Sequence, residues 1–168
     1  MRTCHIMGGD RMAVKDEMVV VRSFFCFTYL MFQIDKRIEN TSLLIGHVEY
    51  CQIRLVRDQR YFWLLIVPER EGLSEWHDLA EDDAAFISRL MHHCSAELKR
   101  ATSATKINIG TIGNIVPMLH IHVVARQAGD PTWPEPVWGR GQATKMSLTE
   151  EAWRVAVVKD IITSFSDE

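Results

Sequence analysis

From residue 32 onward, apolar and polar positions repeat with the periods of strands and helices. Residues 43–46 and 47–56 are predicted as two extended segments, and in the second apolar residues alternate with polar ones, as in a half-buried strand. Residues 62–67 form a continuous apolar run that Pro68 stops, which is typical of a central strand buried on both faces.

Two segments have the three- and four-residue spacing of amphipathic helices. The first covers residues 80–102, and Asp78 followed by Glu81 predicts a capping box at its start. The second begins near Ser147, which is predicted to form a capping box with Glu150. The apolar residues expected on its buried side are Trp153, Val157, Ile161 and Phe165.

Two more strands are predicted at residues 106–109 and 116–126, separated by a glycine-containing turn. A short helical turn at residues 37–40 precedes the first strand. Strands, then a helix, then strands predict an α+β domain. We expect an antiparallel sheet of about five strands that carries one long helix and a C-terminal helix.

The first thirty residues have a weaker pattern. The apolar run at residues 24–32 is too short to span a bilayer and lacks the layout of a signal peptide, so it predicts a strand or a docking segment. Alternatively, the natural start lies downstream, at Met31, and residues 1–31 are an N-terminal extension outside the fold. Residues 32–168 then form the folded domain.

Composition limits the class of partner. A net charge of -3 argues against binding of extended nucleic acid, which favours a basic excess. The four cysteines are far apart and contain no CxxC pair, which fits neither a disulfide framework nor a zinc ribbon. We therefore expect reduced thiols, a cytoplasmic location and no membrane partner.

The strand predicted at residues 116–126 carries two histidines on one face. Because side chains alternate along a strand, Met118, His120 and His122 share the face opposite the core, with the two imidazoles about 7 Å apart. The residues that face the core on this strand are Leu119, Ile121 and Val123.

Two imidazoles at this spacing are suited to chemistry at phosphorus. A neutral imidazole nitrogen can displace a leaving group from a phosphate, and its neighbour can donate a hydrogen bond as charge develops. Two alternatives remain for the histidines alone, namely a surface pair and two ligands of a metal site. The strand that carries them contains no HxE or HxD pattern, and the nearby Asn108, Asn114 and Arg126 favour an anion site.

Residues 113–126 resemble the signature of the histidine triad (HIT) superfamily, in which three histidines alternate with apolar residues. An Arg-Tyr-x-Trp motif at residues 60–63 and a Trp-Pro-x-Pro-Val-Trp-Gly motif at residues 133–139 add to this resemblance. Together they make the chain similar to bacterial HIT-like hydrolases of the diadenosine polyphosphate hydrolase type. The resemblance covers residues 32–165.

The resemblance implies a role for several residues. His120 matches the nucleophile that attacks the α-phosphate, and His122 matches the histidine that contacts the phosphate and orients the site. Asn108 and Asn114 match positions near the ribose and the phosphates. The resemblance also implies a small nucleotide as ligand, a homodimer that pairs two sheets, and a reaction that needs no cofactor or metal.

Met118 departs from the family pattern because it replaces the first histidine of the triad. A thioether accepts hydrogen bonds weakly and donates none, and losing one donor at a developing charge costs on the order of 100- to 1000-fold in rate. Methionine has a length similar to the glutamine that related bacterial sequences carry there, which would preserve the pocket shape. Slower or altered hydrolysis is therefore the expectation.

Two further residues are expected near the ligand. Arg60 is predicted to line a base or ribose pocket, and Trp138 to stack on the nucleotide. For Trp138 the alternative is that the Trp-Pro loop packs on the sheet. The sequence thus predicts a nucleotide hydrolase that acts at the α-phosphate of a dinucleoside polyphosphate or a nucleoside phosphoramidate. The alternatives are a catalytically weak nucleotide-binding or regulatory protein and a nucleotidyltransferase.

Overall fold

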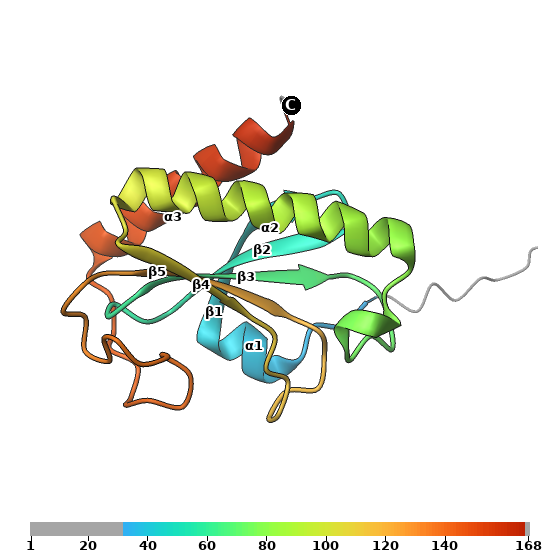
Figure 1. Cartoon of the computed structure of the whole chain (residues 1–168), viewed down its shortest axis with the longest axis horizontal. Helices are drawn as coiled ribbons and strands as arrows, with labels where there is room; N and C mark the ends of the chain where they lie inside the picture. The colour runs from blue at the N-terminus through green and yellow to red at the C-terminus, as the bar shows by residue number, and fades with distance from the viewer. Residues whose placement is uncertain (1–31, 167–168) are drawn as a thin grey trace, which may run out of the picture. The chain divides into compact units, whose positions relative to one another are not determined.

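The computed structural model describes residues 32–166, which form one sheet and three α-helices (Figure 1). The predictions for residues 1–31 lie outside the described residues. None of the helices within residues 32–166 has both the length and the apolar character that a membrane crossing requires. In chain order the elements are α1 Lys36–Thr41, β1 Ser42–Val48, β2 Cys51–Val56, β3 Phe62–Pro68, the 3₁₀ helix η1 Trp76–Asp78, α2 Glu81–Thr102, β4 Lys106–Gly110, β5 Ile121–Arg126 and α3 Leu148–Ser166.

The five described strands form an antiparallel sheet in the order β1-β2-β3-β5-β4. The central strand β3 pairs with β5 through partners that include Leu65↔His122, and all of its residues except Trp63 are buried. The predicted α+β fold, with about five antiparallel strands, a long helix and a C-terminal helix, is therefore confirmed.

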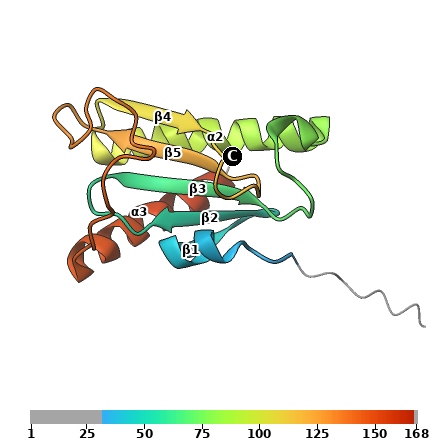
Figure 2. The same cartoon turned by 90° about the horizontal axis from the view of Figure 1, so that it is seen from below.

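One face of the sheet lies against α2 and α3, as the two views show (Figures 1 and 2). Leu64 and Ile66 of β3 and Ile121 and Val123 of β5 point to this face and are fully buried in one apolar cluster. The helices contribute fully buried apolar residues to the same cluster, including Ile87, Leu90 and Leu98 of α2 and Val158 of α3.

The other face is covered by α1 and by loops. There Ile38 of α1 packs with Leu65 and Val67 of β3, while Val124 of β5 packs with Val137 from the loop that follows β5. These are separate and smaller clusters than the one under the long helices.

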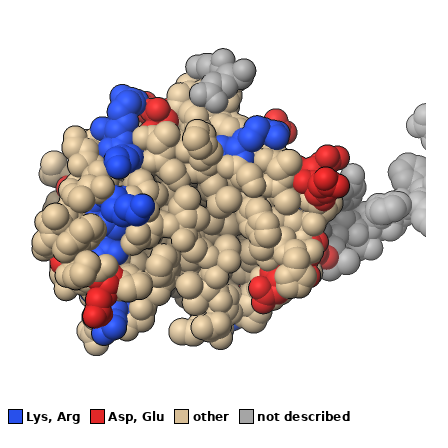
Figure 3. Space-filling view, in the orientation of Figure 1, with Lys and Arg blue, Asp and Glu red and all other residues tan. Residues whose placement is uncertain are grey.

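The face seen in Figure 3 carries small groups of basic and acidic side chains separated by uncharged surface. Several basic groups touch acidic ones, and neither sign forms a continuous patch (Figure 3). The first turn of α2 carries Glu81, Asp82 and Asp83, and its last turn carries Lys99 and Arg100, which complements the helix dipole. The charges at the two ends of α2 are thus explained by the helix itself.

The first hairpin corrects the prediction of one strand at residues 47–56. The chain turns back at Glu49 and Tyr50, and β1 pairs with β2 through Val48↔Cys51. Glu49 has a φ of 50°, in the left-handed region that glycine and asparagine favour. Because neither residue type stands at this turn, its composition contains no turn signal.

The last strand is shorter than the predicted residues 116–126, since β5 begins at Ile121. Pro117 has no N–H to offer a neighbouring strand. The N–H of Leu119 donates instead to the carbonyl of Leu73, in the loop before η1, at 3.0 Å. The segment that leads into β5 is therefore held by a loop rather than by the sheet.

The start of α2 also differs from the prediction. Its N-cap residue is Ala80, which has no capping side chain, so the capping box of Asp78 and Glu81 was wrong. The Asp78 carboxylate instead accepts from the backbone N–H groups of Ser74 and Glu75 at 3.1 and 2.8 Å. Asp78 thus stabilises the turn of η1.

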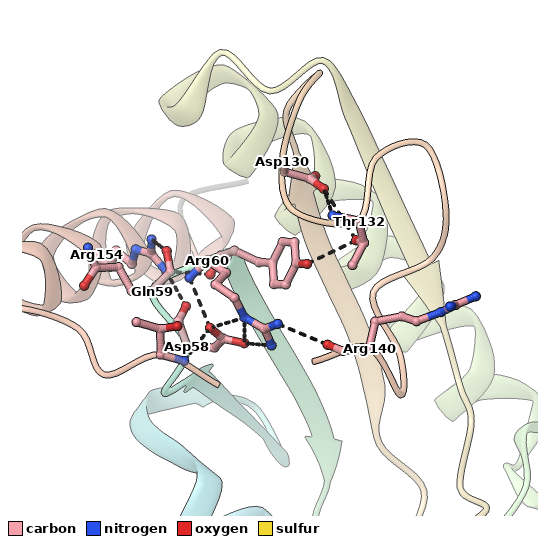
Figure 4. Close-up of polar contacts among 9 residues, drawn as sticks. Asp58, Gln59, Arg60, Asp130, Thr132, Arg140 and Arg154 are labelled. Atoms are coloured by element: carbon pink, nitrogen blue, oxygen red, sulfur yellow. Dashed lines mark hydrogen bonds and ion pairs between the residues drawn. The ribbon is translucent and has the colours of Figure 1, made fainter. Parts of the chain in front are cut away.

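The start of α3 agrees with the prediction in part. Ser147 Oγ accepts from the N–H of Glu150 at 3.1 Å, as a cap should, but the Glu150 carboxylate accepts from Arg154 at 2.6 Å. Arg154 is buried and Trp153 is 45% exposed, so the expected place of Trp153 on the buried side was wrong. Arg154 is drawn inwards because it donates to three carbonyls of the β2–β3 turn, those of Asp58, Gln59 and Tyr61 (Figure 4).

Candidate active site

His120 and His122 lie together on the sheet face opposite α2 and α3. His122 belongs to β5 and His120 directly precedes it, and each is 8% exposed. Their ring centroids are 4.8 Å apart, closer than the spacing of about 7 Å expected for residues two apart on a strand. The two rings are thus inclined towards each other, with His120 one residue before the start of β5.

One hydrogen bond determines which nitrogen of His120 carries the proton. Nδ1 of His120 lies 2.7 Å from the carbonyl oxygen of Met118. A carbonyl oxygen can only accept, so Nδ1 is the donor and Nε2 of the neutral ring keeps its lone pair. Met118 therefore contributes to the site through its backbone, whatever its side chain does.

His122 has the opposite tautomer. The indole N–H of Trp63 donates to Nδ1 of His122 at 2.9 Å, so the proton of the neutral ring lies on Nε2. Burial, with a smaller contribution from the nearby His120, lowers the pKa of His122 to about 3. At neutral pH His122 is thus an uncharged donor.

Trp138 packs on the sheet beside His122. A Cβ at Gly110 would lie 3.1 Å from the Trp138 ring, so the glycine lets the indole approach β4. The Trp138 ring centroid is 5.8 Å from that of His122 and 6.3 Å from that of Trp63, and both pairs are T-shaped. These aromatic contacts restrict the orientation of His122.

A pocket of about 480 Å³ opens in front of the two histidines. Its apolar wall includes Ile38 of α1, Leu65 of β3 and Val137 of the loop after β5. Three arginines, Arg37, Arg60 and Arg140, also line it. The volume and the mixture of apolar and cationic groups suit a ligand with an aromatic or aliphatic part and an anionic part.

The predicted site residues are only partly brought together. Arg60 lines the pocket, and Trp138 contacts His122. The side chain of Met118 packs with the cluster of Ile38, Leu65 and Val67.

The two asparagines lie elsewhere. Asn108 of β4 accepts a hydrogen bond from Arg126 at 2.7 Å, and Asn114 is exposed in the loop after β4. Neither belongs to the residues that line the pocket with the histidines. A substrate contact by either asparagine therefore remains a prediction.

Arg126 organises the loop that follows β5. It is 1% exposed and forms an ion pair with Asp130 at 2.7 Å. It also donates to Thr132 Oγ1 at 3.2 Å and to the carbonyl of Glu135 at 3.0 Å. The loop that carries Val137 and Trp138 is thereby tied to the end of β5.

Residues 32–166 contain no group of three or more His, Cys, Asp or Glu side chains placed to hold a metal ion. Two cysteines, Cys51 and Cys94, are buried free thiols within this range, and burial raises the pKa of each to about 12. They belong to the apolar cluster under α2 and lie apart from the candidate site.

The sequence did not predict several charged residues that line the pocket or pair with its arginines. Asp35, Arg37 and Arg140 were not singled out as site residues, yet each borders the pocket or pairs with an arginine that does. The signal was present as the spacing Asp-x-Arg, which occurs at residues 35–37 and again at residues 58–60.

Comparison with known proteins shows what the chain resembles. A family model described as the HIT domain matches residues 37–129. A histidine triad protein of Sinorhizobium meliloti 1021 is 43% identical, with 77% of this chain and 96% of that chain covered and a TM-score of 0.75. A second from Bradyrhizobium japonicum is 33% identical (79% and 98% covered, TM-score 0.76), and a third from Marinobacter aquaeolei VT8 is 27% identical (80% and 98%, TM-score 0.77). No curated protein matches the sequence.

Proposed function

We propose a function from the premise that this chain belongs to the histidine triad (HIT) family. In this proposal the protein binds a nucleotide conjugate in the pocket beside the histidines. It hydrolyses the conjugate at the α-phosphate through a covalent adduct on His120. The observation that carries the proposal is the hydrogen bond from His120 Nδ1 to the carbonyl of Met118 at 2.7 Å. That bond leaves Nε2 as a nucleophile with a free lone pair.

The reaction has two displacements at phosphorus. The Nε2 lone pair of His120 bonds to the α-phosphorus, and the leaving group departs with the electron pair of its own bond and gains a proton. Water then bonds to the same phosphorus, the N–P bond returns its electron pair to Nε2, and the water releases a proton. Two moderate barriers replace one high barrier, and the scheme uses no metal.

His122 is suited to stabilise the phosphate during both steps. Its Nε2–H is a donor held in place by the Trp63 hydrogen bond at Nδ1, and its ring is 4.8 Å from that of His120. Because its pKa is lowered to about 3, His122 stays neutral at cellular pH, with its proton on Nε2. A donor that is already oriented needs no reorganisation as charge develops.

Two rival functions follow from specific features. Met118 in place of a histidine favours a catalytically weak nucleotide-binding or regulatory protein. A histidine adduct that passes to an acceptor other than water would make the protein a nucleotidyltransferase.

Incubation with diadenosine polyphosphates and with adenosine phosphoramidate separates these functions. We expect release of AMP by the wild-type protein, an adenylyl adduct detectable by mass spectrometry, and loss of both in His120→Ala. The matched control is His92→Ala, an exposed histidine of α2. Tight AMP binding without turnover would support the regulatory protein, and a nucleotidyl product on a supplied acceptor would support the transferase.

We further propose that two copies pair through β4. This strand is at the edge of the described sheet, and Ile109 and, just beyond the strand, Ile112 are 47% and 44% exposed. An apolar edge strand is a template for pairing with another chain. Ile109→Lys is expected to convert a dimer to a monomer in light scattering, and a wild-type monomer would refute this proposal.

The division of the chain is also a proposal. We propose that residues 32–168 form the HIT-like domain and that residues 1–31 are an extension. A protein that starts at Met31 is expected to keep the unfolding free energy and the AMP affinity of the full chain. A cytoplasmic location stays a prediction from the spacing of the cysteines.

A further inference from the structure

Two arginines that line the pocket are held in the same way. Asp35 accepts from the backbone N–H of Arg37 at 2.8 Å, from its Nε at 2.9 Å and from its Nη2 at 2.6 Å. The remaining terminal nitrogen, Nη1, donates to the carbonyl of Ile115 at 2.5 Å, which lies 78 residues further along the chain.

Arg60 repeats this pattern (Figure 4). Asp58 accepts from the backbone N–H of Arg60 at 3.1 Å, from its Nε at 3.0 Å and from its Nη2 at 2.7 Å. Its Nη1 donates to the carbonyl of Arg140 at 3.1 Å, which lies 80 residues further along the chain. The two Asp-x-Arg units thus share four contacts of the same kind.

The two carbonyls belong to different loops of the same pocket. Ile115 lies in the loop that leads into β5, and Arg140 in the loop that follows β5, so the loops reach the pocket from opposite ends of that strand. Figure 1 shows them as separate segments of the chain. Ile115 and Val116 line the pocket from the first loop, and Gly139 and Gly141 from the second.

We infer that Arg37 and Arg60 are positioning residues, two latches that each hold one loop at the border of the pocket and so set its shape for the ligand. This inference rests on the proposed function only in taking the ligand to be a nucleotide. A planar guanidinium has five N–H donors in a fixed fork, so a carboxylate can orient it while another N–H holds a carbonyl.

The surroundings of Arg60 fit this role. A Cβ at Gly141 would lie 2.6 Å from Nη1 of Arg60, and Gly141 has a φ of 64°. The loop therefore bends closely around the guanidinium, in a conformation that other residues rarely adopt.

The carboxylates stay charged in both units. Hydrogen bonds from Arg37 lower the pKa of Asp35 to about 2. Burial raises the pKa of Asp58, but hydrogen bonds from Arg60 and from the N–H of Thr144 outweigh it and lower that pKa. The Asp58 pair is more buried than the Asp35 pair, with the arginine side chains 17% and 53% exposed.

Hydrogen–deuterium exchange of the full chain without ligand tests the latches directly. Arg37→Gln should speed exchange of the amides at residues 111–116, and Arg60→Gln that of the amides at residues 138–143. We expect about 10-fold for Arg60→Gln and about 3-fold for the more exposed Arg37→Gln, the range of one hydrogen bond to a charged donor. Each variant should leave the other loop unchanged.

Matched controls remove the same charge nearby. Lys36→Gln and Arg57→Gln alter exposed neighbours whose side chains make no hydrogen bond within residues 32–166, and they should change neither loop. Arg60→Lys keeps the charge but loses the fork, so it should behave like Arg60→Gln. Thermal melting checks that each variant is folded. If Arg60→Gln is unfolded, the exchange experiment is carried out with Arg60→Lys instead.

Three outcomes would each overturn the inference that Arg37 and Arg60 are latches. They are unchanged exchange in both loops, equally faster exchange of both loops in either variant, and exchange as slow as in the wild type in Arg60→Lys. Calorimetry with AMP gives the separate readout. We expect weaker AMP binding by about 10-fold in Arg60→Gln, the effect of one such hydrogen bond. Loop-specific exchange in a protein that does not bind AMP would contradict the proposed function and leave the latches intact.

Discussion

The two faces of the sheet are closed by different forces. Against α2 and α3, β3 and β5 present fully buried apolar side chains such as Leu64 and Val123 to one large cluster. The opposite face has smaller apolar clusters, and its loops are fastened by hydrogen bonds from arginines such as Arg60 and Arg126.

The two kinds of contact explain how a small domain can be both stable and open to a ligand. Burial of apolar area is not directional and stabilises the fold as a whole. Hydrogen bonds of arginines are directional and hold a loop at one place without filling the space beside it. The helix-covered face therefore supports the domain, while the loop-covered face leaves room for a pocket beside His120 and His122.

Removal of the nucleophile should have the largest effect, because it is expected to lower activity and leave stability almost unchanged. His120→Ala is expected to lower turnover of adenosine phosphoramidate by roughly 10⁴- to 10⁶-fold, the scale seen when an enzyme loses its nucleophile. The unfolding free energy should change by less than about 1 kcal/mol, because little apolar area is lost. Steady-state kinetics and urea unfolding give the two values, and turnover that survives would refute the assignment of His120.

A substitution on the helix-covered face should instead lower stability. Leu64→Ala is expected to lower the unfolding free energy by about 2–5 kcal/mol, because it leaves a cavity in the large cluster. The control is Leu44→Ala, since Leu44 is 45% exposed and its loss should matter little. Urea unfolding measures both, and equal effects at the two positions would contradict the comparison.

Trp63→Phe removes one hydrogen bond from the open face and keeps an aromatic ring. Without the indole N–H, His122 is no longer restricted to the tautomer with the proton on Nε2, so turnover should fall about 10- to 100-fold. Nitrogen NMR of His122 reports the tautomer directly. Trp153→Phe is the control, since Trp153 packs edge-on against Phe62 on the helix-covered side; an equal loss there would show that the hydrogen bond is not the cause.

The smallest effect is the pH dependence of stability that His122 causes. Its folded pKa of about 3 lies below the ordinary value of 6.5, so the unfolded chain binds the proton more readily. Stability is therefore unaffected well above pH 6.5 and decreases as the pH falls from 6.5 towards 3. Between pH 7 and pH 5.5 the wild type should lose about 1 kcal/mol more than His122→Asn does, as 1.36 kcal/mol per pKa unit implies.

Urea unfolding at both pH values tests this prediction. Parallel pH dependence in wild type and His122→Asn would show that His122 takes up a proton as easily in the folded chain as in the unfolded one.

Local patterns were enough for the features that depend on neighbours in sequence. The apolar run of β3, the stripe of α2 and the Ser147 cap were all predictable because strand and helix periods act over a few residues. The same alternation placed His120 and His122 on the face opposite Ile121 and Val123. The turn at Glu49 escaped prediction because it uses a positive φ without glycine or asparagine.

The place of His120 and His122 on one face of the sheet was therefore determined by the sequence alone, together with the α+β fold and the family resemblance. The proton position of His122 was decided only by tertiary structure, because Trp63 reaches it from the neighbouring strand β3. The two Asp-x-Arg units are visible in the sequence, but their carbonyl partners lie 78 and 80 residues away. A hydrogen bond over that separation exists only after the chain has folded, since no local period relates its two ends.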